Sequence, residues 1–347
     1  GITGDDLTGG YHVEVDRDDE VVYTSKYQPE YSSGLKIYGK TISYQYKHPE
    51  YADLTREQKD FLRGRIDAFE NSLAAENYKD KQNGYRKYID VTSFIDYMLS
   101  TEFARNVDGY RLSTSLYKHR DSVDPRFKMS LWDFNLGFGN ADYNDGWNTR
   151  SWAYKMNDIA PNEGQLIPFW WQRLLSDPDF VQEMKTRWTT YRNTNYSEAN
   201  IMHVVDSLTN NLNKEDAQYR NSLAWPRWGQ WVWPNKFVAL SYTEEINYIK
   251  DWIKERLAFM DGTLYTDVET LQVNPVSVYP NPVPRNGVLK IKGENIRTIK
   301  LINMQGIQYI RKDSSTDELS VSGVPSGYYL VVVETSQNVV TKKIRIR

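Results

Sequence analysis

Apolar and polar positions alternate along residues 9–47 in the manner of β-strands. Tyr11, Val13 and Val15 form one such series, and Ile42, Tyr44 and Tyr46 form another. Shorter apolar runs lie between them, at 21–23 and 35–37. A period of two residues is typical of strands with one buried face. The start of the chain therefore predicts a β-meander of a few strands.

Beyond residue 54 the apolar positions recur every three or four residues, which predicts amphipathic helices. One helix opens at Thr55, where Gln58 completes a capping box, and another opens at Asp90. In the second helix the spacing buries Val91 to Phe103 and leaves Asp96 and Glu102 outward. The same spacing predicts later helices at 167–175, from 177 to 188, at 201–212 and at 241–260.

From Val278 the pattern changes to short strands separated by turn residues. The strands are expected at 288–291, 296–302, 318–321, 328–334 and 339–346. Such spacing implies a small antiparallel sandwich. We therefore predict an α+β protein with a mostly helical domain that has a β-rich start (1–265), a linker (266–276) and a β-sandwich (277–347).

Composition limits the function classes. The chain has 347 residues, enough for two domains, and a net charge of -3 with interspersed signs gives no reason to expect nucleic-acid binding. No apolar run approaches the ~20 residues needed to cross a bilayer. No signal peptide opens the chain, which is expected to be a mature or trimmed fragment. The absence of cysteine excludes disulfides, thiolate metal sites and a cysteine nucleophile.

Two motifs admit competing interpretations. Residues 34–41 formally satisfy the phosphate-binding loop pattern, but strand-like alternation follows them where a helix is required, so a strand hairpin is favoured. Residues 225–234 carry four tryptophans, which could form a stacking platform for sugar rings or fill gaps between helices. The packing role is favoured.

The candidate chemistry lies in two loops. Asp108 precedes Gly109, and Asp133 precedes the glycine-containing run 134–140; each acid follows an apolar segment. Metal-assisted phosphoryl transfer needs one acid facing a hydroxyl nucleophile and another holding the ion that neutralises phosphate charge. The alternative is that Asp108 caps a turn and Asp133 bonds backbone amides.

Three ordered blocks, at 88–97 (YIDVTSFIDY), 106–118 (NVDGYRLSTSLYK) and 131–140 (LWDFNLGFGN), resemble the CotH kinase family. These are spore-coat-type atypical protein kinases with many secreted relatives in Bacteroidetes. Residues 9–16 (GGYHVEVD) and the helix around 246–253 also resemble that family, so the likeness covers residues 1–265. It implies an atypical protein-kinase-like lobe.

The resemblance implies a role for each matched position, with Mg²⁺ and ATP as cofactors. Asp108 takes the catalytic-loop acid position and Asn106 fixes that loop. Asp133 takes the metal position, with Asn135 beside it. Ser113 stands where kinase-type loops place a second metal ligand, and Lys118 is expected to contact phosphate.

The resemblance also implies a whole activity: transfer of the γ-phosphate of ATP to Ser or Thr of an extracellular or envelope protein. The amino-terminal lobe of such a kinase would precede residue 9, so this fragment is expected to be inactive alone. The rival hypothesis is a cell-surface module that binds glycan or protein through the Trp-rich loop without catalysis. The third hypothesis is a purely structural envelope protein.

The C-terminal domain resembles the sorting domain of the type IX (Por) secretion system, on the residues 278–282 (VYPNP), 303–306 (NMQG) and 327–330 (GYYL). The likeness implies an immunoglobulin-like sandwich that is recognised by the secretion machinery. It places the protein in the extracellular space or on the outer-membrane surface, with no transmembrane segment.

Overall fold

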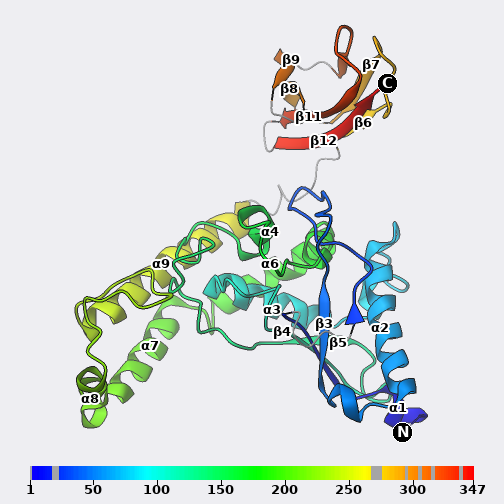
Figure 1. Ribbon diagram of the computed structural model, residues 1–347. Coiled ribbons are helices and arrows are strands. Elements are labelled where there is room, and N and C mark those ends of the chain that lie inside the picture. Colours follow the sequence, from blue (N-terminus) through cyan, green and yellow to red (C-terminus); the bar gives the residue numbers. More distant parts are fainter. Residues whose placement is uncertain are drawn as a thin grey trace. The chain divides into compact units, whose positions relative to one another are not determined.

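The computed structural model describes residues 2–17, 23–266, 276–293, 296–303, 307–313, 317–335 and 339–347. The chain divides into two compact units, Gly1–Tyr265 and Thr266–Arg347 (Figure 1). Residues 267–275 of the expected linker, 21–22 of the expected meander and 304–306 of the sorting motif lie outside the described residues.

The first unit contains a five-stranded antiparallel sheet with the order β2-β3-β1-β4-β5. Its strands are β1 (Tyr11–Val15), β2 (Tyr23–Thr24), β3 (Ser43–His48), β4 (Thr114–Lys118) and β5 (Phe127–Ser130). The sheet is therefore no local meander, because β4 pairs with β1 from a hundred residues away. Val13 lies opposite Leu116 in that pairing.

Residues 34–41 do not form a phosphate-binding loop. Gly34, with a φ of +76°, lies in a turn closed by an antiparallel bridge between Glu30 and Lys36. The next element is β3 and not a helix. This geometry agrees with the hairpin interpretation.

Helices make up most of the remaining first unit. Asp90 and Thr55 accept the expected cap hydrogen bonds, and Thr55 with Gln58 forms the predicted capping box. The helices before β4 are α1 (Gly4–Thr8), η1 (Tyr51–Asp53), α2 (Arg56–Ala74), η2 (Tyr85–Lys87) and α3 (Val91–Ala104). Those after β5 are η3 (Ala153–Lys155), α4 (Met156–Ile159), α5 (Trp170–Leu175), α6 (Pro178–Arg192), α7 (Glu198–Asn213), η4 (Lys214–Asp216), α8 (Ala217–Ala224) and α9 (Tyr242–Thr266).

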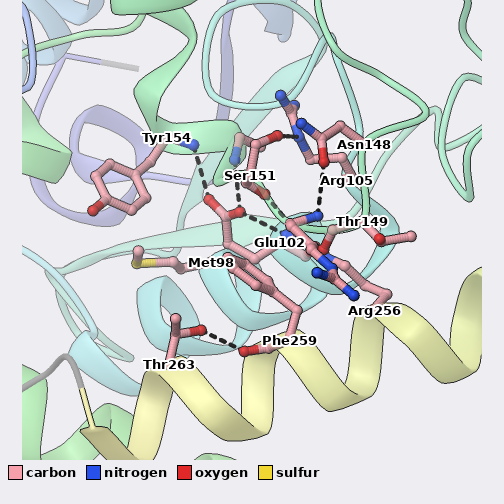
Figure 2. A network of polar contacts seen from close by, with 12 residues as sticks. Met98, Glu102, Arg105, Asn148, Thr149, Ser151, Tyr154, Arg256, Phe259 and Thr263 are labelled. Carbon is pink, nitrogen blue, oxygen red and sulfur yellow. Dashed lines mark hydrogen bonds and ion pairs between the residues drawn. The ribbon is translucent and has the colours of Figure 1, made fainter.

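Glu102 corrects the expected orientation of the second helix. Its side chain is buried and not outward, at 1% exposure. It pairs with Arg256 of α9 at 3.2 Å and accepts a hydrogen bond from the backbone N–H of Tyr154 (Figure 2). It also accepts hydrogen bonds from the Tyr110 hydroxyl and from the backbone N–H of Ala153. Such partners offset the cost of burying a carboxylate. This network joins α3, the 149–154 segment and α9.

The Trp-rich loop also differs from expectation. Its four indoles, on Trp225, Trp228, Trp231 and Trp233, are between 39% and 64% exposed. They do not fill gaps between helices, so the packing interpretation is wrong.

The second unit is an antiparallel sandwich, as predicted, and the α+β class is confirmed. One sheet has the order β10-β7-β6 and the other β12-β11-β8-β9. The strands are β6 (Ser277–Tyr279), β7 (Val288–Lys292), β8 (Ile296–Asn303), β9 (Gln308–Asp313), β10 (Glu318–Ser320), β11 (Gly327–Thr335) and β12 (Val339–Ile346). Alternate apolar residues of both sheets, such as Leu289, Leu301 and Val331, form one core.

Candidate functional site

The Asp108 loop starts where α3 ends. Arg105 adopts a left-handed conformation (φ +50°) that stops the helix after Ala104. Gly109 is required by close packing, because a Cβ there would lie 2.3 Å from the Thr101 methyl group. The turn is closed by the N–H of Leu112, which donates to the carbonyl of Asp108 at 2.8 Å.

Asn106 joins this loop to the Asp133 loop. Its amide oxygen accepts from the backbone N–H of Asp108, and its Nδ2 donates to the carbonyl of Asp133, both at 3.2 Å. Asn106 is only 2% exposed. One buried side chain therefore fixes the backbones of both candidate acids.

Both acids line one cleft of about 540 Å³. Glu14 and Asp16, on β1 and just after it, add two further carboxylates. Positive charge comes from Arg17 and from Lys47 of β3. Hydroxyl groups come from Ser113, Ser115 and Ser130, while His12, Leu112 and Trp132 complete the lining.

The electrostatics of the cleft act on Asp108. Burial raises the pKa of its carboxyl, and the charges of Asp133 and Asp16 raise it further. Arg111 and Arg17 oppose this effect; the Arg111 guanidinium lies 3.1 Å from the Asp108 carboxylate. Asp108 is therefore a half-buried acid whose proton affinity is increased, in contact with a buried cation.

Two groups on β1 are shifted as well. Burial raises the pKa of Glu14, while the Lys47 ammonium, 3.9 Å away, opposes the shift. Burial and the nearby positive charge lower the pKa of His12. His12 is therefore held neutral at physiological pH, where it contacts Ser115.

The other candidate residues are placed differently. Ser113 lines the cleft in a left-handed conformation (φ +48°), and Asp133 shares that conformation (φ +56°). Asn135 is exposed and is absent from the cleft lining, while its carbonyl accepts from Asn140.

Lys118 lies away from the cleft. It occupies the strand position whose side chain points to the opposite sheet face from Ser115. Its ammonium donates to the carbonyls of Thr8 and His119 and contacts Asp121. This placement contradicts the expected phosphate contact, because the buried ammonium already has three partners.

The donor chemistry fits a magnesium nucleotide. Mg²⁺ takes oxygen ligands, commonly one or two carboxylates plus substrate phosphates, and the cleft offers carboxylates beside two cationic side chains. Among the described residues, no group of three or more acidic, histidine or cysteine side chains is clustered tightly enough to hold a metal alone. Asp133, the position that the resemblance assigns to the metal, lies in the lining of this cleft.

Sequence reasoning assigned no role to Glu14, Asp16, Lys47 or His12. The sequence did show that three of these residues lie together: positions 12, 14 and 16 share one face of a strand by the same alternation that buries Val13 and Val15. The sequence did not show that β1 pairs with β4, and this pairing brings the face next to the Asp108 loop.

Comparison with protein families finds two matches. The family model described as CotH kinase protein matches residues 10–260. The model of the secretion system C-terminal sorting domain matches residues 277–347, and this indicates secretion to the cell surface or the extracellular space. A search of curated proteins finds no match. No helix in the described part of the chain is long and apolar enough to span a membrane.

Proposed function

Because the chain belongs to the CotH kinase family, we propose that the protein is a secreted atypical protein kinase. It transfers the γ-phosphate of ATP, as a magnesium complex, to Ser or Thr of an extracellular or envelope protein. The sorting domain delivers it through the type IX secretion machinery, after which it is attached to the cell surface or released.

The observation that carries this proposal is the shared cleft. Asp108 and Asp133 come from loops 25 residues apart, yet both line the same cavity and are tied together by Asn106. If the two acids only capped turns, there would be no reason for both to line one cleft. The cavity volume of about 540 Å³ is in the range of small-molecule sites.

Each residue has a distinct role in the proposed reaction. The Asp108 carboxylate accepts the proton of the attacking hydroxyl, and its raised pKa moves it toward the value that suits a general base near neutral pH. Asp133 holds the magnesium ion, which when bound neutralises phosphate charge. Lys47 and Arg17 supply positive charge to the lining of the same cleft.

The test is phosphate incorporation into casein and into the protein itself by the full-length protein, with Mg²⁺ and ATP. Asp133→Asn and Asp108→Asn are each expected to lower the rate about 100-fold or more, since each removes a group used in the transition state. Asp60→Asn, an exposed acid of α2, serves as the control and should leave the rate unchanged. Equal incorporation by the wild type and Asp133→Asn would remove Asp133 from the mechanism.

The exposed Trp-rich loop favours a second candidate function, binding of surface glycan. Trp231 donates its indole N–H to Asp142 at 3.0 Å, and Trp233 stacks on Tyr143 with an interplanar angle of 11°. Both rings are thus oriented while more than half exposed, and an oriented aromatic face suits stacking against a sugar ring.

Calorimetric titration with soluble bacterial glycans tests this candidate. Trp231→Ala is expected to weaken binding at least tenfold, with or without ATP. Tyr38→Ala, which removes another exposed aromatic ring outside the loop, should have no effect. Unchanged affinity in Trp231→Ala would exclude the loop as the glycan site.

A further inference from the structure

A second pocket lies between α9, Trp147 and residues 236–237. Its volume is about 570 Å³. Aromatic rings form its walls: Trp147, Phe237, Tyr248 and Trp252. Phe237 and Tyr248 are stacked at 4.5 Å with an interplanar angle of 6°.

The polar groups of this pocket are mostly acidic. Glu244, Asp251 and Glu255 line it from α9, and Lys236 and Asn247 are the other polar side chains. The three carboxylates outnumber the single ammonium of the lining, while Lys254 of α9 lies 3.7 Å from Asp251 and balances part of its charge. All three carboxylates are exposed, so solvent and salt screen their charges and their attraction for a cation is strongest at low ionic strength.

Lys236 shows which chemistry the pocket accepts. Its ammonium lies over the Trp147 ring, 4.1 Å from the centroid. Aromatic faces with nearby carboxylates attract cations through the ring quadrupole and through charge. The chain thus places one of its own cations where an external cation would bind.

We propose that this pocket binds a ligand carrying an organic cation, a guanidinium or alkylammonium group. The cation takes the face of Trp147 in place of the Lys236 ammonium, and the α9 carboxylates balance its charge. The site is separate from the Asp108 cleft, since the two share no lining residue, and its ligand binding does not depend on the proposed kinase activity.

The experiment is calorimetric titration of the full chain at low ionic strength with butylguanidine and with butylurea, which has the same shape without the charge. Butylguanidine should bind and butylurea should not. Asp251→Asn should weaken binding about three- to tenfold. Lys236→Gln should strengthen it about threefold, because it frees the Trp147 face.

A matched control and a second probe complete the design. Glu76→Gln removes an exposed carboxylate elsewhere and should not change the affinity. An arginine-containing peptide and its citrulline counterpart, again differing only in charge, decide whether the cation is presented by a polypeptide or by a free small molecule. Equal binding of charged and neutral probes, or weaker binding by Lys236→Gln, would overturn the proposal.

Discussion

Glu102 is the residue on which the packing of α3 against α9 depends most directly. Arg256, which is fully buried, donates to the Glu102 carboxylate and carbonyl and to the carbonyls of Thr149 and Ser151. Burial lowers the pKa of Arg256 to about 10, while the Glu102 charge opposes that shift. Removing one member of such a pair leaves the other as an uncompensated buried charge.

Glu102→Gln is therefore expected to lower the free energy of unfolding by about 3–5 kcal/mol. Asp96→Asn, on the same helix, is the control: Asp96 pairs with Arg187 where both side chains are about one-third exposed, so its loss should cost about 1 kcal/mol or less. Denaturant unfolding of both variants measures the difference. A smaller loss for Glu102→Gln than for Asp96→Asn would contradict the assigned role.

The error over Glu102 shows what residue spacing can and cannot predict. The three-four period correctly identified the buried side chains Phe94 and Met98. It was wrongly taken to leave Glu102 outward, although position 102 follows Met98 by four residues and therefore lies on the same helix face. Its partners, Arg256 and the 153–154 backbone, come from distant segments that local periodicity does not contain.

At the scale of elements, the helices could be predicted from residues close together in the sequence. The candidate site could not, because it depends on the pairing of strands that are far apart in the sequence. The caps at Thr55 and Asp90 could be predicted because a cap involves neighbours in sequence. The pairing of β1 with β4 depends on contacts across a hundred residues. Asp108 and Asp133 could thus be proposed as site residues from their loops and a family resemblance. The presence of Glu14 and Lys47 in the lining of the same cleft could not be predicted. Lys118 was misplaced for the same reason, since strand pairing decides which sheet face meets the cleft.

Gly139 connects the candidate site to the second pocket at this same scale. It has a φ of +78°, and a Cβ there would lie 2.4 Å from the Trp252 ring. The Tyr248 hydroxyl donates to its carbonyl at 2.8 Å. Two walls of the aromatic pocket therefore hold the end of the run that begins at Asp133, which fixes that run against α9.

At the scale of the whole molecule, each unit has its own core. The buried residues that form the sandwich core all lie between Val276 and Ile346. Leu99 of α3 and Leu301 of β8 are equally buried, at 1% and 0% exposure, in different units. Because a cavity destabilises the core in which it forms, the two leucines report on the two units separately.

We expect the chain to unfold in two thermal transitions, one for each unit. Leu301→Ala should destabilise the sandwich by about 2–5 kcal/mol and lower only its transition, while Leu99→Ala should lower only the other. Scanning calorimetry of the full chain and of both variants measures this. A domain of roughly 70 residues has a free energy of unfolding of only a few kcal/mol. Leu301→Ala should therefore leave the sandwich largely unfolded at 37 °C while the first unit stays folded. If either substitution lowers both transitions equally, the units are one cooperative body, and the sorting domain cannot be treated as a module that folds separately from the kinase-family unit.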